Sequence, residues 1–177
     1  MIAAKSVKPA LQLAYVKLMM DVIGRGLVMA SQVDEEVKQE VAKFPENFTL
    51  SMKVFPHGPA FIARVTAGRE LELVPDLAAK PDLTITFKHL SHAFLVFSFQ
   101  ESTAQAFAND RMIADGDLSY AIRLVRCLNK MESLILPKLI ASLAVKEYPE
   151  QLGFKEKFSN ASLIYLKLAQ SFLKRSA

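Results

Sequence analysis

The residues best suited to acid–base or metal chemistry are three histidines and a few carboxylates, and their spacing gives little support to either. His89 and His92 stand three residues apart, which on a helix would place both imidazoles on one face, where they could bind a metal ion. No cysteine lies nearby and no carboxylate follows at a ligand spacing, while His57 belongs to a turn rich in proline and glycine. We therefore interpret the pair as a surface feature at the start of a helix and predict no metal site.

Asp115 and Asp117, on either side of Gly116, could form a pair of catalytic carboxylates. A turn at the glycine and capping of the helix that follows explain both residues without catalysis. The tripeptide Gly24-Arg25-Gly26 lacks the spacing and preceding strand of a phosphate loop, and no Gly-x-Ser-x-Gly motif occurs. We therefore predict no catalytic residues, no cofactor and no enzymatic activity. The alternative is an enzyme whose reacting side chains meet only in the folded chain, and turnover of an acyl substrate would reveal it.

The cellular compartment is indicated by cysteine use and by hydropathy. Cys127 is the single cysteine, which rules out an internal disulfide bond and is typical of a reducing compartment, so we expect a cytoplasmic protein. Because it lies beside the apolar face of a predicted helix, we interpret it as a packing residue and not as a reactive thiol. No signal peptide is recognisable, and Lys17, Asp21 and Pro137 interrupt the longest apolar stretches, so we expect no membrane span.

The most informative feature is an excess of large apolar side chains within one short stretch. They are Phe87, Phe94, Phe97, Phe99, Phe107 and Met112. A predicted amphipathic helix follows, whose apolar face carries Leu118, Ala121, Leu124, Val125, Leu128 and Met131. From the residues alone, an ordinary close-packed core is the favoured interpretation and an apolar binding cavity is the alternative.

The elements that hold these side chains are predicted from periodicity and turn residues. In order they are a strand, an apolar run, a short helix, a short strand and a long helix, over residues 82–88, 93–99, 104–107, 112–114 and 118–131. Gly116 predicts a sharp turn with positive φ, and Asp117 is a good N-cap for the long helix.

Two helices, over residues 9–29 and 33–43, are predicted before this stretch. The apolar stripe of the first is Leu11, Ala14, Tyr15, Leu18 and Val22. Gly24 and Gly26 predict a bend or break in the first helix, and Ser31 is a candidate cap for the second. We interpret residues 1–45 as a helical extension of the same domain, with pairing to a second subunit in a homo-oligomer as the alternative.

Three antiparallel strands joined by short turns are predicted over residues 47–55, 61–66 and 71–73, at the start of a domain that spans residues 46–177. Beyond the long helix, Pro137 should begin or kink a further helix, and a last helix is predicted over residues 159–173. The apolar stripe of that last helix is Leu163, Leu166, Ala169 and Phe172. Its stripe needs a surface to pack on, so we expect either permanent packing or a mobile lid.

The order and spacing of several residues in this chain resemble the sterol carrier protein 2 family. The matching residues are Asp82, Thr84, Ala106-Phe107, Gly116-Asp117 and Ala121. The resemblance covers residues 82–128 and extends from about Phe48. Where the family usually has Gly-Lys after the Ala-Phe helix, this chain has Asn109-Asp110-Arg111, which keeps only the basic character.

The resemblance implies an α+β fold, with a mostly antiparallel sheet of about five strands covered by helices and extra helices at both ends. Family members hold fatty acids, acyl-CoA or sterol-like lipids in an apolar tunnel between sheet and helices, which implies non-catalytic lipid binding and lipid transport. The tunnel residues would here be Phe87, Phe94, Phe97, Phe99, Phe107, Met112, Ala121, Leu124, Val125, Leu128 and Met131. The alternative is an accessory or scaffold role in lipid or isoprenoid-quinone biosynthesis.

The net charge of +4 comes from one end of the chain. Residues from Lys130 onward carry eight basic and four acidic side chains, so the preceding residues are balanced. A solvated helical surface is the favoured interpretation, and transient contact with an anionic membrane surface is the alternative. We predict no nucleic-acid binding, because the basic residues are scattered and no aromatic-rich binding strand accompanies them.

Overall fold

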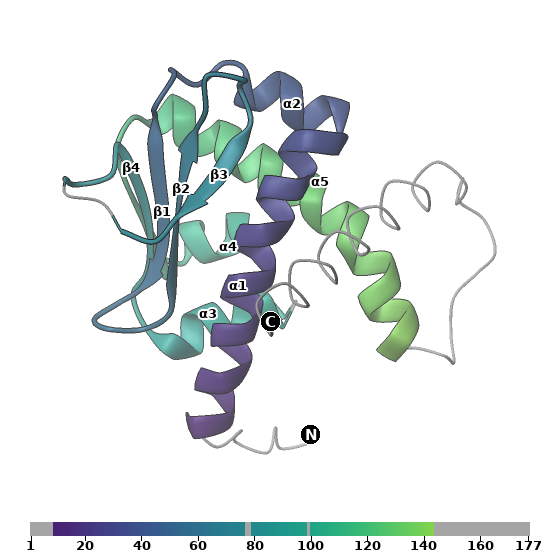
Figure 1. Cartoon of the computed structure of the whole chain (residues 1–177). Coiled ribbons are helices and arrows are strands. Elements are labelled where there is room, and N and C mark those ends of the chain that lie inside the picture. The colour runs from purple at the N-terminus through teal and green to yellow at the C-terminus, as the bar shows by residue number, and fades with distance from the viewer. Residues whose placement is uncertain (1–8, 77–78, 99, 144–177) are drawn as a thin grey trace.

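The computed structural model describes residues 9–76, 79–98 and 100–143, and side chains as far as Ile135 in the last helix (Figure 1). In chain order the elements are α1 (Pro9–Val33), α2 (Glu35–Val41), β1 (Thr49–Val54), β2 (Ala60–Val65), β3 (Leu71–Val74), β4 (Leu83–Phe87), α3 (Leu90–Phe97), α4 (Thr103–Ala108), β5 (Met112–Asp115) and α5 (Leu118–Leu143). The predicted last helix, over residues 159–173, lies outside the described residues.

The strands form one five-stranded sheet in the order β3-β2-β1-β4-β5. All neighbours are antiparallel except β1 and β4, which run parallel with Met52 opposite Ile85. Helices α1, α3 and α5 pack against the sheet, α1 on β2 and β3 and the other two on β4 (Figure 1). The predicted α+β fold with a mostly antiparallel sheet is therefore confirmed.

Helix α1 runs without interruption through Gly24 and Gly26, so the break that these glycines predicted does not occur. A Cβ atom on Gly24 would lie 3.0 Å from Cγ of Phe61, and one on Gly26 would lie 2.9 Å from Cδ1 of Ile135. The glycines therefore allow the helix to approach β2 and α5 closely, and they do not break it.

The face that α1 buries also differs from the predicted stripe. Leu11 and Leu18 on the predicted stripe are 63% and 55% exposed. The buried positions are instead Val16, Met19, Met20, Ile23, Leu27 and Ala30. Both faces of the helix are apolar enough to be buried, and the sheet contacts only one of them.

The sequence predicted that Ser31 caps the second helix, and this prediction is wrong. Asp34 is the N-cap of α2, and its Oδ1 atom accepts a hydrogen bond from the backbone nitrogen of Val37 at 3.0 Å. Ser31 belongs to α1, where its hydroxyl donates to the carbonyl oxygen of Val28 and accepts from the nitrogen of Leu71 at 2.9 Å. It therefore ties α1 to the first residue of β3.

The turn into α5 has the predicted geometry. Gly116 has a φ of +140°, and the carboxylate of Asp117 accepts a hydrogen bond from the nitrogen of Ser119 at 2.7 Å. Leu118, however, is 68% exposed and does not belong to the buried face. Pro137 does not begin a separate helix as predicted, because α5 continues through it to Leu143.

Candidate ligand-binding site

The structure brings the predicted tunnel residues together from four elements. Side chains from β4, β5, α3 and α5 belong to a single buried cluster, namely Phe87, Phe97, Met112, Ala121, Leu124, Leu128 and Met131. Phe94 and Phe107 pack against this cluster and are partly buried, as is Val125 on α5. Phe99 lies outside the described residues. The cluster occupies the space between the sheet and its covering helices.

Aromatic contacts connect the sheet, α3 and α1 across this cluster. The rings of Phe87 and Phe97 meet edge to face with centroids 5.2 Å apart. Phe94 makes a similar contact with Tyr15 of α1 at 5.5 Å, and the Tyr15 hydroxyl donates to the carbonyl oxygen of Phe97 at 2.8 Å. Burial raises the pKa of Tyr15, which keeps the phenol a hydrogen-bond donor. The sequence placed Tyr15 on an apolar stripe but gave no sign of this link to α3.

Methionine is concentrated in the same interior. Of the seven methionines, five are buried in the cluster, namely Met19, Met20, Met52, Met112 and Met131. Methionine side chains are unbranched and polarisable, so they can repack around guests of different shape. The sequence prediction included Met112 and Met131 but missed the contributions of α1 and β1, because nothing local shows which elements face each other.

A polar cavity of about 210 Å³ borders this apolar interior. It lies between the α3–α4 junction and α5 and is lined by Val96, Glu101, Ser102, Thr103, Asn129 and Glu132. Burial raises the pKa of Glu132 above its ordinary value. This cavity could not be predicted from the sequence, since its two carboxylates are 31 positions apart and belong to no motif.

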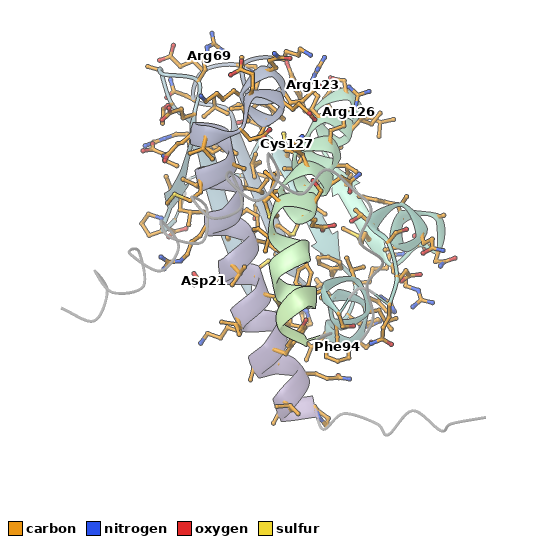
Figure 2. All side chains as sticks on the ribbon, turned by 90° about the vertical axis from the view of Figure 1, so that its right-hand side faces the viewer. Asp21, Arg69, Phe94, Arg123, Arg126 and Cys127 are labelled. Atoms are coloured by element: carbon orange, nitrogen blue, oxygen red, sulfur yellow. The ribbon has the colours of Figure 1, made fainter. Side chains whose placement is uncertain are left out.

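A second cavity, of about 480 Å³, follows the groove between α2 and α5. Its walls are joined by ion pairs, including Arg123 with Glu40 at 2.9 Å and Lys130 with Glu36 at 2.6 Å. Figure 2 shows Arg123 and Arg126 near Cys127 at this end of α5, far from Phe94. Burial, with the nearby charge of Glu40, raises the pKa of Cys127 to about 12, so the thiol is protonated and the predicted packing role is confirmed.

The other residues considered for chemistry have structural roles. His89 is the N-cap of α3, and its ring lies 5.1 Å from that of His92. Burial, with the charges of His89 and Arg111, lowers the pKa of His92. Asp115 pairs with Lys80 at 2.7 Å, while Asp117 caps α5. Within the described ranges no three histidine, cysteine or acidic side chains gather as metal ligands.

Among the described residues, no helix combines the length and the apolar character that crossing a membrane requires.

Neither a family model nor a curated protein sequence matches the chain. Its structure is similar to that of the UbiJ-SCP2 ubiquinone synthesis protein, with 14% identity and a TM-score of 0.45 over 71% of this chain and 98% of that chain. It is also similar to apo sterol carrier protein 2 from Yarrowia lipolytica, with 14% identity and a TM-score of 0.43 over 63% and 87% of the two chains. The sterol carrier protein domain 2 of Helicoverpa armigera gives 19% identity and a TM-score of 0.41 over 72% and 94%.

Proposed function

We propose that this protein binds the hydrocarbon chain of a lipid between its sheet and helices α1, α3 and α5, and carries the lipid without reacting with it. The observation that supports this most is the gathering of seven predicted tunnel residues, from four separate elements, into one apolar cluster. The order of motifs from Asp82 to Ala121 and its resemblance to sterol carriers point to the same function.

The composition of the interior supports an adaptable site. Five methionines and the ring pair of Phe87 and Phe97 lie in one cluster, and α1 adds two of those methionines to it. Burial of a hydrocarbon chain contributes about 25 cal/mol per Å² of apolar surface, with weak discrimination between chains. We therefore include residues 1–45 in the binding domain and expect several chain lengths to bind.

A photoactivatable fatty acid added to the purified full-length chain tests the proposal directly. Peptide mapping should place the crosslinks on buried residues of α3 and α5 such as Phe97 and Leu128. Crosslinks confined to the exposed residues Leu11 and Leu18 would instead show adsorption to the surface, and would contradict the proposal.

A pair of substitutions adds a matched control. Ala121 is buried on α5, so Ala121→Leu should reduce the space for a chain and weaken uptake of a fluorescent fatty acid. Ala104 is exposed on α4, and Ala104→Leu adds the same atoms without reaching the interior. Circular dichroism establishes that both variants are folded before uptake is compared.

The proposal extends to where the lipid is exchanged. We propose that the protein is cytoplasmic and that it exchanges its lipid at anionic membrane surfaces. The basic residues from Lys130 onward would contact these surfaces. Transfer of a fluorescent lipid between vesicles should be faster with anionic than with neutral vesicles.

Mass spectrometry of an organic extract of the purified protein would identify the ligand. Copurification of biosynthetic enzymes would instead favour the accessory role in lipid or isoprenoid-quinone biosynthesis.

A further inference from the structure

Helix α3 covers one end of the apolar interior. Its buried residues are Ala93, Val96 and Phe97, and the ring of Phe97 meets that of Phe87 on β4 edge to face. Figure 1 shows α3 at the end of the sheet away from α2, beside the first turns of α1. A displacement of α3 would therefore uncover the Phe87 side of the interior without separating the strands of the sheet.

One side chain of α1, Tyr15, holds α3 in this position. Its hydroxyl donates to the carbonyl oxygen of Phe97 at 2.8 Å, and its ring meets that of Phe94 edge to face at 5.5 Å. Carbonyl groups in the last turn of a helix have no partner within the helix, so the hydroxyl supplies one. In the part of the chain that the structure describes, no other hydrogen bond joins α1 to α3.

The start of α3 lacks polar partners. His89 is the N-cap, but its side chain accepts no hydrogen bond from the first turn, whereas Asp34 and Ser102 cap α2 and α4. Nδ1 of His92 is buried and has no hydrogen-bond partner among the described residues. Water would solvate both sites if α3 moved outward, and this favours displacement. The closed position therefore depends on apolar packing and on Tyr15.

We propose that α3 is the gate through which a lipid chain enters the interior, and that Tyr15 is the positioning residue that keeps the gate closed. This inference rests on the proposed function. The hydrogen bond from Tyr15 to Phe97 joins two elements of the protein, so it forms whether the interior is empty or holds a lipid. It therefore stabilises both closed states alike, and it slows entry and release without changing the affinity.

The substitution Tyr15→Phe tests the gate, because it removes the hydroxyl and keeps the ring that contacts Phe94. Stopped-flow fluorescence measures the uptake of cis-parinaric acid by the full-length chain, and the release of this probe when excess palmitate is added. Both rate constants should rise about two- to tenfold, the change expected for loss of one hydrogen bond. The dissociation constant of the probe should stay the same.

Tyr120 provides a matched control away from α3. Its ring stacks on that of Phe44, with centroids 5.2 Å apart, and also contacts Phe48. Tyr120→Phe should therefore leave both rate constants unchanged. Equal increases in the two variants would indicate general destabilisation and would contradict the gate. Circular dichroism establishes that each variant is folded.

Hydrogen exchange tests the gate in the unmodified chain as well. The amides of α3 should exchange faster than those of β1 and β4, because α3 opens while the sheet stays folded. In Tyr15→Phe, exchange should become faster in α3 and stay the same in β1 and β4. Protection of α3 equal to that of the two strands in the unmodified chain would overturn the proposal.

The outcomes separate this inference from the proposed function. If the probe binds but Tyr15→Phe leaves both rate constants unchanged, or raises only the release rate and so weakens binding, Tyr15 does not hold a gate and lipid binding stands. If the probe does not bind to the unmodified chain, lipid binding itself is wrong.

Discussion

Asp82 joins the beginnings of the two parallel strands through Thr49. Oδ2 of Asp82 accepts hydrogen bonds from the backbone nitrogen and the hydroxyl of Thr49, at 2.8 and 2.7 Å. The backbone nitrogen of Asp82 donates to the same hydroxyl at 3.1 Å. The pair therefore stabilises the start of the β1–β4 pairing, and this gives a structural role to an aspartate that the sequence resemblance singled out.

Removal of this carboxylate should destabilise the sheet. We expect Asp82→Ala to lower the free energy of unfolding by about 1–2 kcal/mol, because hydrogen bonds to a charged group are lost. Chemical denaturation measures the change. Thr49→Val removes the hydroxyl, and a double-mutant cycle of this variant with Asp82→Ala should show coupling. Thr49→Ser keeps the two hydrogen bonds of the hydroxyl with Asp82 and is the control. An unchanged denaturation midpoint for Asp82→Ala would contradict the role.

Gly116 should not tolerate a side chain. Its φ of +140° disfavours any L residue, and a Cβ atom would lie 2.6 Å from the carbonyl oxygen of Asp82. Gly116→Ala should therefore destabilise the protein by at least about 1 kcal/mol. The control is Gly68→Ala, whose Cβ would lie 3.7 Å from Oγ1 of Thr66. Equal melting temperatures for the two variants would show that the turn does not require glycine.

Glu40 should stabilise the packing of α2 on α5 at neutral pH. Burial acts to raise its pKa, but the hydrogen bond from Arg123 and the charges of Lys43, Arg123 and Arg126 outweigh burial and lower the pKa. A carboxyl with a lowered pKa contributes stability above its unfolded pKa and loses that contribution as pH falls through the folded pKa. Glu40→Gln should therefore lower stability by about 1 kcal/mol at pH 7.

The pH dependence provides the check on Glu40. The difference between Glu40→Gln and the unmodified protein should shrink as the pH falls below the ordinary pKa of glutamate and through the lowered pKa of Glu40 in the folded state. It should also shrink in high salt, which screens the ion pairs. A stability difference that is constant with pH would mean that the loss comes from packing and not from charge.

Glu132, unlike Glu40, should destabilise the folded protein at neutral and higher pH. Burial raises the pKa of Glu132 in the folded state. Between the ordinary pKa of glutamate and this raised pKa, the folded state binds more protons than the unfolded state. Stability therefore falls as the pH rises through this range. Glu132→Gln should raise the melting temperature at pH 8 and leave it unchanged at pH 4. A loss of stability at pH 8 would contradict the raised pKa.

Cys127 should be inert in the folded protein. Its pKa of about 12 leaves almost no thiolate at pH 8, and the side chain is buried. Iodoacetamide should label it only after denaturation, as measured by intact mass. Rapid labelling of the native chain would show that the groove between α2 and α5 opens readily.

Several local features could be predicted from the sequence because they depend on neighbouring residues. The alternation of apolar residues in β1 and β4 identifies a strand whatever it packs against, since successive side chains point to opposite faces. Gly116 and Asp117 specified their turn and cap because backbone sterics and a short hydrogen bond act within a few residues.

The tertiary structure decided which surfaces meet. Helix α1 carries more than one apolar face, and periodicity alone favoured the stripe with Leu11 and Leu18, whereas β2, β3 and α5 bury a different face. Gly24 and Gly26 predict a break by local propensity, yet they serve close packing against Phe61 and Ile135. Each glycine inside a helix costs about 1 kcal/mol relative to alanine, and the packing of a long buried helix outweighs this cost.

The cavity between the α3–α4 junction and α5 depends wholly on tertiary structure. Glu101 and Glu132 are ordinary acidic residues in the sequence, and they line one cavity only because the α3–α4 junction packs beside α5. The sequence by itself determined the strands, the turn, the cap and an apolar interior, since each follows from contacts between near neighbours. Only folding decided which side chains surround that interior, because residues distant in the chain interact only when the fold brings their elements together.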